Sequence, residues 1–342
     1  MALAGSLLSF SSTQAQTPEE AGQLYGSGQL AQLIAQGEAS LRTDDQQPVL
    51  LLFVGRACAD QGRFADALPH LEKSRQAPAG PDRVKAWSLG YLGTAYYAAD
   101  KPAKARAALS ECIALNSTQN ATQYAQKRLL AYQLTPYYAR WNVVETPHLR
   151  VHIQDSTRLP EAVQYAAARE QAYQAINRFC GATLGKKIDF YLWQDAAEAQ
   201  RQLGRELGFA QPSLGLVNAL VGQTRGHEIA HVLVHHGLRP AHTARLVNES
   251  AAVYFDQPAT DRLHRARQLA PARVDVWRLW EHPEEFTAEQ VYAVGGALLE
   301  YLAALSTPAQ FRALLHDQRA TTHRAPLEQL VAAFEQELSK PQ

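Results

Sequence analysis

The spacing of apolar residues along the chain changes near residue 138. Before that point, apolar and small residues recur at the spacing of amphipathic helices. After it, segments 148–154 and 187–193 have the pattern of β-strands, whereas segments 160–179 and 196–207 have the pattern of helices. The sequence therefore predicts a helical first part followed by a mixed α+β second part.

Two long segments of the helical part are similar to each other. Residues 51–74 align with residues 89–112 when Gly55 is placed on Gly93, at an offset of 38 residues. The other aligned pairs are Ala67 with Ala105 and Leu71 with Leu109. Small residues at such positions let paired helices approach each other, so each segment is predicted to form two packed helices.

This pattern resembles tetratricopeptide repeats, whose period is about 34 residues. The longer offset fits if residues 78–82, Pro-Ala-Gly-Pro-Asp, form a long turn between two repeats, and residues 24–41 form an earlier half-repeat. The resemblance implies a concave surface for a protein partner or a substrate. The alternative is that these helices only cap and solubilise the domain that follows.

The strongest chemical signal is the motif HEIAH at residues 227–231, inside the largely apolar run 226–233. Positions i and i+4 of a helix lie on one face with Cβ atoms about 5 to 6 Å apart, so His227 and His231 can bind one metal ion. Glu228 lies next to that face, where its carboxylate can take a proton from a metal-bound water. The alternative is a buried helix whose imidazoles hydrogen-bond to carbonyl groups.

A catalytic zinc needs three protein ligands and one open position, so a third ligand is expected on another element. Glu249, in the segment NESAAVYF, follows His231 by 18 residues. Gly237 and Pro240 predict that the first helix ends between them, so that a second helix can return and face it. A three-histidine motif, HExxHxxGxxH, is excluded because the chain has Val234 and Gly237 where that motif needs glycine and histidine.

HEIAH followed by NESAAVYF resembles the gluzincin metallopeptidases, the thermolysin-like and aminopeptidase-like members of the peptidase MA superfamily. The resemblance implies a zinc ion (Zn²⁺) as cofactor, held by His227, His231 and Glu249. It also implies that Glu228 is the general base and that Asn248 supports the site.

The resemblance covers residues 140–335 in layout, although the specific motifs lie within residues 226–256. Thermolysin-like enzymes have an aspartate four residues after the ligand glutamate that orients a zinc histidine, and this chain has Val253 there. The Gly-x-Met-Glu-Asn segment that anchors a substrate amino terminus in aminopeptidases is missing. The partner that orients the histidine must therefore come from elsewhere, and aminopeptidase activity is not implied.

Two further segments resemble parts of a gluzincin cleft. Residues 214–220 lie just before the HEIAH helix, where gluzincins have an edge strand that can bind an extended peptide; an internal strand is the alternative. Residues 291–302 resemble a late helix in which a tyrosine donates a hydrogen bond to the tetrahedral oxyanion, which makes Tyr292 a candidate catalytic residue. The alternative for Tyr292 is a buried aromatic residue at helical spacing.

The remaining histidines and tryptophans near the motifs are not expected to take part in chemistry. His235 and His236 fall at the end of the HEIAH helix, where imidazolium interacts favourably with the helix dipole and solvent. Trp277, Trp280 and His282 are expected to pack or to line a surface.

Composition excludes several classes of function. With 342 residues, of which 46% are hydrophobic, the chain can form two domains with sizeable cores. Because 33 basic residues balance 33 acidic ones without a block of like charge, nothing indicates nucleic-acid binding. No window has the 18 or more apolar residues of a membrane span. Cys58, Cys112 and Cys180 are widely spaced and are expected to be buried free thiols.

Residues 1–16 form a short apolar stretch followed by small and polar residues, which resembles the end of a bacterial secretory signal peptide. The basic segment that usually starts such a peptide is absent. This predicts export to the periplasm or the medium through a truncated signal peptide. The alternative is an ordinary disordered terminus on a cytoplasmic protein.

These features together predict an α+β protein with tetratricopeptide-like repeats at residues 17–138 and a gluzincin-like domain at residues 139–342. The second domain is expected to have an α/β part with a small mixed sheet at residues 139–222 and a helical part at residues 223–342. The predicted function is a zinc-dependent peptidase acting on peptides or proteins. The alternative is a non-catalytic or vestigial relative that binds a protein partner through its repeats, although a purely structural metal site would need no Glu228.

Overall fold

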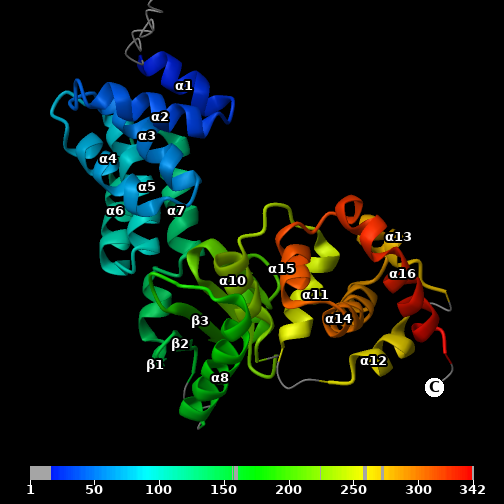
Figure 1. Cartoon of the computed structure of the whole chain (residues 1–342). Coiled ribbons are helices and arrows are strands. Elements are labelled where there is room, and N and C mark those ends of the chain that lie inside the picture. The colour runs from blue at the N-terminus through cyan, green and yellow to red at the C-terminus, as the bar shows by residue number, and fades with distance from the viewer. Residues whose placement is uncertain are drawn as a thin grey trace, which may run out of the picture. The chain divides into compact units, whose positions relative to one another are not determined.

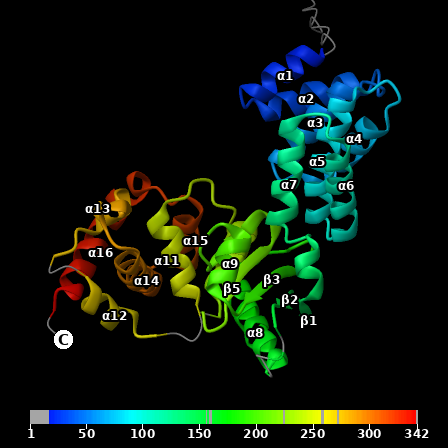
Figure 2. The same ribbon diagram turned by 180° about the vertical axis from the view of Figure 1, so that it is seen from behind.

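The chain is mostly helical and divides into two compact units between Thr135 and Pro136 (Figures 1 and 2). The computed structural model describes residues 17–155, 157, 161–223, 225–256, 260–270 and 273–340, so the expected signal peptide at residues 1–16 lies outside it. None of the helices in these ranges is both long enough and apolar enough to span a membrane.

The first unit consists of helices that pack against each other in sequence order (Figure 1). They are α1 (Pro18–Gly26), α2 (Leu30–Leu41), α3 (Pro48–Asp60), α4 (Phe64–Gln76), α5 (Asp82–Ala98), α6 (Pro102–Leu115) and α7 (Gln119–Ala131). Proline in the first turn of α1, α3 and α6 suits a position whose N–H has no partner within the helix. The long turn expected at residues 78–82 lies between α4 and the start of α5.

Four turns of the first unit have the same construction. Gly28, Gly62, Asp100 and Gln133 each have a positive φ of 56° to 75°, and the next N–H donates to the carbonyl five residues earlier at 2.8–3.0 Å. This arrangement is a common end for a helix. The four residues are 34, 38 and 33 positions apart, so α7 corresponds to the first helix of a further repeat. The expected half-repeat at residues 24–41 is part of a two-helix hairpin, α1 and α2.

The aligned glycines of the two repeats make the same contact. A Cβ atom on Gly55 would lie 2.7 Å from Leu71 Cγ, and a Cβ atom on Gly93 would lie 2.4 Å from Leu109 Cγ. Only glycine lets the leucine of the following helix come this close. The close approach expected from the aligned small residues is therefore confirmed.

The second unit begins with a five-stranded mixed sheet in the order β1-β2-β3-β5-β4. The three middle strands are parallel, and each edge strand is antiparallel to its neighbour. The strands are β1 (Asn142–Glu145), β2 (Leu149–Ile153), β3 (Ile188–Trp193), β4 (Phe209–Gln211) and β5 (Leu216–Leu220).

The strand expected before the HEIAH helix is β5, and it is an internal strand. Phe209, Ala210 and Gln211 of β4 pair with its outer side, while β3 pairs with the other side. The interpretation of residues 214–220 as an edge strand that binds a substrate is therefore wrong. An extended peptide could add to the sheet only beyond β4 or β1.

One face of the sheet forms the core of the second unit. Ile188, Phe190 and Leu192 of β3 belong to a buried cluster that includes side chains of α8 (Ala162–Cys180) and α10 (His227–Leu238). Because side chains alternate along a strand, Asp189, Tyr191 and Trp193 point to the opposite face. The three cysteines of the described chain, Cys58, Cys112 and Cys180, are buried and free, which confirms the expectation for them.

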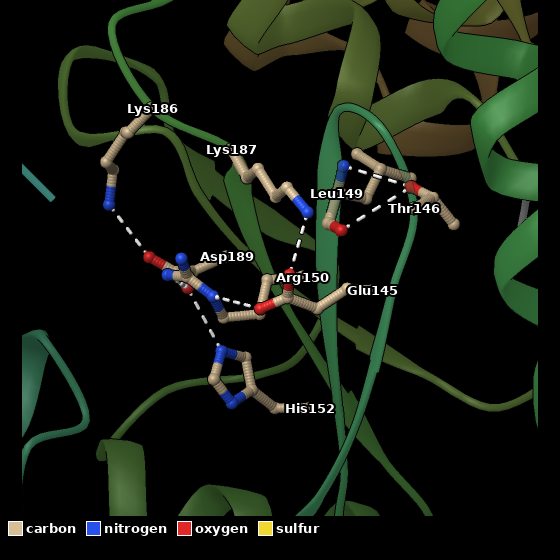
Figure 3. Close-up of polar contacts among 8 residues, drawn as sticks. All are labelled: Glu145, Thr146, Leu149, Arg150, His152, Lys186, Lys187 and Asp189. Carbon is tan, nitrogen blue, oxygen red and sulfur yellow. Dashed lines mark hydrogen bonds and ion pairs between the residues drawn. The ribbon is translucent and has the colours of Figure 1, made fainter.

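A polar cluster is buried on that opposite face (Figure 3). Asp189 is only 4% exposed and accepts hydrogen bonds from Arg150 Nη1 at 3.0 Å and Lys186 Nζ at 2.8 Å, and it lies 3.0 Å from His152 Nε2. Burial opposes ionisation of Asp189, but these partners outweigh it and hold the pKa of the carboxyl well below its usual range. The cluster joins β2 to β3 through Arg150, His152 and Asp189.

The rest of the second unit is helical. Its helices are α9 (Ala196–Leu203), α10, α11 (Arg245–Phe255), α12 (Arg262–Leu269), α13 (Val276–Glu281), α14 (Ala288–Leu305), α15 (Pro308–His316) and α16 (Ala320–Leu338), with short 3₁₀ turns η1 (Pro136–Arg140), η3 (Pro212–Leu214) and η4 (Pro283–Glu285).

Two consecutive glycines bring α14 against α11. A Cβ atom on Gly295 would lie 1.9 Å from Ser250 Oγ, and one on Gly296 would lie 2.4 Å from Val253 Cγ1. Ser250 directly follows Glu249, so this contact fixes the helix that carries the expected third ligand. Tyr292 lies about one turn before the glycines on α14.

Candidate metal centre

The HEIAH motif forms the first turns of α10, which begins at His227. The carboxylate of Asp256 lies beyond the amino end of this helix, where Oδ1 accepts hydrogen bonds from the N–H groups of Gly226 at 2.7 Å and His227 at 3.2 Å. A carboxylate at this end of a helix satisfies free N–H groups and interacts favourably with the helix dipole. Asp256 thereby joins the end of α11 to the start of α10.

The first helix ends where the sequence predicts, between Gly237 and Pro240, but Gly237 has a different role from the expected one. Helix α10 continues through Gly237 and ends at Leu238, followed by Arg239 in the left-handed conformation with φ of 49°. A Cβ atom on Gly237 would lie 2.4 Å from the carbonyl oxygen of Cys180. Gly237 is therefore needed for close packing against the end of α8 and does not stop the helix.

Helix α11 brings Glu249 to the two histidines of α10. Glu249 Oε2 lies 3.4 Å from His227 Nε2 and 3.6 Å from His231 Nε2, and donor atoms of the three side chains all lie within 4.8 Å of one another. Ligand atoms at about 2.0–2.2 Å from a tetrahedral zinc ion are about 3.3–3.6 Å apart. The donor set and its spacing therefore fit zinc, and it is the one such group of His, Cys, Asp and Glu in the described ranges.

The carboxylate of the group is in the form that a cation requires. Burial opposes ionisation of Glu249, but its contacts with His227 and His231 outweigh this effect and hold its pKa well below the usual range. Burial lowers the pKa of His227, but Glu249 and other nearby carboxylates raise it above its ordinary value. A raised pKa favours the protonated imidazole, so binding of a metal ion through His227 requires the loss of that proton.

Asn248 contacts the far side of one ligand ring. Its side-chain amide lies 3.4 Å from His231 Nδ1, while His231 Nε2 faces Glu249. A contact on the second ring nitrogen fixes the orientation of a ligand histidine. Val253, at the position of the orienting aspartate of thermolysin-like enzymes, cannot make such a contact, and Asn248 Nδ2 is the atom that lies beside His231 Nδ1.

One carboxylate oxygen of Glu228 is buried and has no hydrogen-bond partner among the described residues. Within the described part of the chain, no donor lies within hydrogen-bond distance of Glu228 Oε2. Burial raises the pKa of this carboxyl above its ordinary value, although the two neighbouring histidines oppose the rise. An isolated carboxylate of raised basicity beside a metal group is an arrangement for accepting a proton.

Tyr292 stands at the edge of the group. Its ring centre is 6.0 Å from that of His227, and the residue is 37% exposed. Burial of the phenol raises its pKa, so its O–H remains available to donate a hydrogen bond. Tyr292 is therefore not a buried packing residue, the alternative considered for it.

A cavity of about 590 Å³ opens beside the metal group. We call it the metal-side cavity. Its lining comes from the loops around β5, from α10 and α11, and from α12 and α14: Leu207, Gly208, Ala219, Gly222, Gln223, Arg225, His227, Glu228, Val253, Asp256, Thr260, Arg262, Arg265, Tyr292 and Ala293. Its size is within the range of pockets that hold small ligands or a few residues of a peptide.

The histidines and tryptophans discounted from the sequence lie outside the metal group. His236 Nε2 is 2.9 Å from the carbonyl oxygen of Pro212, and burial lowers the pKa of both His235 and His236. Trp277 and Trp280 stack with ring centres 5.4 Å apart. Trp280 also donates from Nε1 to Gln318 O at 2.9 Å, which is a packing role.

The sequence did not point to three residues of this region. The sequence gives no sign that Asp256 contacts the start of α10, because 30 residues separate it from Gly226 and no local pattern relates the two residues. Arg225 and Arg265 lie on the cavity wall only because the fold brings the loop before α10 close to α12. Single exposed arginines have no sequence signature.

Comparison with known proteins places part of the first unit in a family. Residues 46–117 match the tetratricopeptide repeat family, and they span α3 to α6. The resemblance of the amino-terminal helices to such repeats is therefore confirmed. Neither the curated proteins nor the solved structures contain a match to the chain.

Proposed function

We propose that the protein is a zinc-dependent peptidase of gluzincin type whose second unit hydrolyses peptide bonds. The meeting of His227, His231 and Glu249 within 4.8 Å, beside a carboxylate with a buried unpartnered oxygen, carries the proposal. A structural zinc site is normally closed by four protein ligands and needs no general base. Glu228 has no evident use in such a site, whereas a hydrolase needs a base there.

Each residue of the site has a distinct role in the proposed hydrolysis. When held by His227, His231 and Glu249, zinc supplies a Lewis acid that polarises a carbonyl and lowers the pKa of water to about 7. Glu228 accepts the proton of the attacking water at its free oxygen, since burial makes its carboxylate a stronger base than an exposed one. Its carboxyl group then donates that proton to the nitrogen of the leaving amine.

Two residues support these steps. Asn248 holds the ring of His231 through the Nδ1 side, so that Nε2 stays directed towards Glu249. Tyr292, which lines the same cavity as Glu228, is proposed to donate its O–H to the oxygen that becomes negative as the carbonyl is attacked. Its partial exposure leaves the phenol accessible to a substrate.

The tetratricopeptide repeats suggest interaction with a protein. The second candidate function is therefore an interaction protein with a structural or vestigial metal site, and the match of residues 46–117 to the repeat family favours it.

The two functions differ in their response to a chelator. The peptidase proposal expects the zinc-loaded protein to cleave members of a mixed peptide library, with cleavage lost on chelation and restored by added zinc. Mass spectrometry of the products would detect this. If zinc binds stoichiometrically and no member of a broad library is cleaved, the interaction protein is the better account.

A further inference from the structure

We propose that Arg225 and Arg265 form a carboxylate-binding subsite on the wall of the metal-side cavity, so that substrates carry an acidic group beside the bond that is cleaved. The cleavage part of this statement rests on the proposed peptidase function. The binding of a carboxylate by the two arginines does not.

The wall of this cavity carries a small surplus of positive charge, although the whole chain is neutral. Three arginines, Arg225, Arg262 and Arg265, line it, against the two carboxylates of Glu228 and Asp256. In the whole chain, by contrast, 33 basic residues balance 33 acidic ones. A surplus of one sign of charge on a cavity wall favours ligands of the other sign.

One of the three arginines, Arg262, already forms hydrogen bonds within the protein. Arg262 is only 5% exposed and donates to Glu300 Oε1 at 2.8 Å and to the carbonyl oxygens of Val253 and Tyr254 at 3.2 and 2.9 Å. These bonds attach the first turn of α12 to α11 and α14. Arg262 therefore serves as an anchor, and it fixes the helix from which Arg265 extends.

The two carboxylates of the cavity also have other roles than pairing with these arginines. Asp256 accepts hydrogen bonds from two N–H groups at the start of α10, and Glu228 is assigned to proton transfer. By contrast, Arg225 and Arg265 are exposed, and no acidic side chain of the described ranges lies within ion-pair distance of either. Arg225 and Arg265 thus line the cavity without a counter-ion among the acidic side chains that the structure describes.

The two arginines line the same cavity as Glu228, the proposed general base. Arg225 stands two residues before His227, and Arg265 comes from α12 across the same cavity. A guanidinium offers paired N–H donors that match the two oxygens of a carboxylate. Such a carboxylate can be an aspartate or glutamate side chain of the substrate or its free carboxyl terminus.

Binding can be measured separately from cleavage. The protein would be the Glu228→Gln variant loaded with zinc, and the probes would be four alanine-rich fluorescent hexapeptides read by anisotropy. One has two central glutamates and an amidated end, one has central lysines and an amidated end, one is neutral with a free carboxyl terminus, and one is neutral and amidated. Metal-free parent protein provides a second host if this variant does not fold.

The proposal expects the glutamate peptide, the free-carboxyl peptide or both to bind about tenfold more tightly than the neutral amidated one. Charge reversal at both positions, R225E with R265E, should remove this preference, and the preferred probe shows which carboxylate is recognised. Arg178→Glu is the matched control, because Arg178 is exposed on α8 and does not line the cavity. A preference that survives the double reversal, or equal binding of all four probes, overturns the subsite.

The same peptides separate failure of the subsite from failure of the proposed function. If the zinc-loaded parent cleaves neutral and acidic peptides equally well and binding shows no charge preference, the peptidase stands and the subsite is wrong. If binding depends on the two arginines but nothing is cleaved, the subsite stands and the peptidase assignment is wrong.

Discussion

Glu249 and the two histidines decide whether the second unit binds a metal ion. Because their donor atoms lie within 4.8 Å, the purified protein should contain close to one zinc ion per chain. His231→Ala and Glu249→Ala should each lose most of it, since two ligands rarely hold zinc against exchange. Atomic absorption after gel filtration measures the content.

His235→Ala provides the matched control for those variants. His235 lies one turn further along α10 and outside the ligand group, so its loss should leave the zinc content unchanged. Full zinc in both ligand variants, or loss of zinc in the control, would contradict the assignment.

Asp189 gives a prediction about pH. A carboxyl whose pKa is depressed in the folded protein stabilises the fold above its unfolded pKa of about 3.9, and this contribution is lost as the pH falls below that value. Asp189→Asn should therefore lower the free energy of unfolding at pH 7 by about 3 kcal/mol, because it removes the negative charge that pairs with the buried ammonium group of Lys186. The difference from the parent should shrink at pH 3.

Urea unfolding at both pH values measures this effect. Glu285→Gln is the control, because its ion pair with Arg278 is exposed to solvent and should contribute little to stability. If Asp189→Asn were as stable as the parent at pH 7, or if its deficit were the same at pH 3, the buried cluster would not have the role given to it.

Residues in local motifs could be predicted from the sequence, whereas their tertiary partners could not. His227, His231 and Glu249 follow from spacing along two helices, and the structure brings all three together. The contact of Asp256 with the start of α10 depends on the path of a whole helix and connection, for which the sequence has no local signal.

At the scale of helices and strands, the contact of α14 with α11 gives the clearest prediction. Gly295→Ala would place a methyl group 1.9 Å from Ser250 Oγ and should force the helices apart. We expect a loss of about 2–3 kcal/mol in the free energy of unfolding and weaker zinc binding, since Glu249 precedes Ser250 on α11. Denaturant unfolding and a competitive zinc titration measure the two effects.

Gly185→Ala is the matched substitution for that experiment. Nothing lies within 4 Å of a Cβ atom placed on Gly185, which also belongs to the second unit. It should change stability by less than about 1 kcal/mol. A Gly295→Ala variant that is as stable as Gly185→Ala and binds zinc like the parent would contradict the described packing.

Element types followed from periodicity, but the order of the strands did not. The strands around residues 149–153 and 188–193 and the helices of the two motifs lie where the apolar pattern predicts them. The sequence leaves open whether residues 214–220 form an edge strand or an internal strand, because β4 has only three residues, Phe209–Gln211, too few for an alternating pattern to be recognised. Its pairing converts β5 into an internal strand.

At the scale of the whole molecule, the residues of the metal centre all belong to the second unit. The three donors and the buried hydrophobic cluster around them lie between residues 149 and 338. A protein of residues 136–342 should therefore fold, bind one zinc ion and cleave short peptides with the kcat/KM of the full chain. Loss of zinc binding in a folded truncated protein would contradict this separation.

The truncated protein also tests whether the two units have separate roles. The tetratricopeptide repeats match a family over residues 46–117, and protein interaction is the role that they suggest. Removing them should impair cleavage of a protein substrate that they bind and leave short peptides unaffected. The repeats could be predicted from the aligned glycines, whereas α7 as the start of a further repeat became evident only from the turn at Gln133.

The central claim is that Glu228 performs chemistry and does not hold the metal. Glu228→Gln keeps the size of the side chain but cannot accept a proton, so the variant should fold, retain zinc and bind peptide. Its rate of hydrolysis should fall by a factor of about 10² to 10⁴. Circular dichroism and zinc content establish that the comparison is valid. A folded, zinc-loaded variant that cleaves a peptide as fast as the parent would contradict the account.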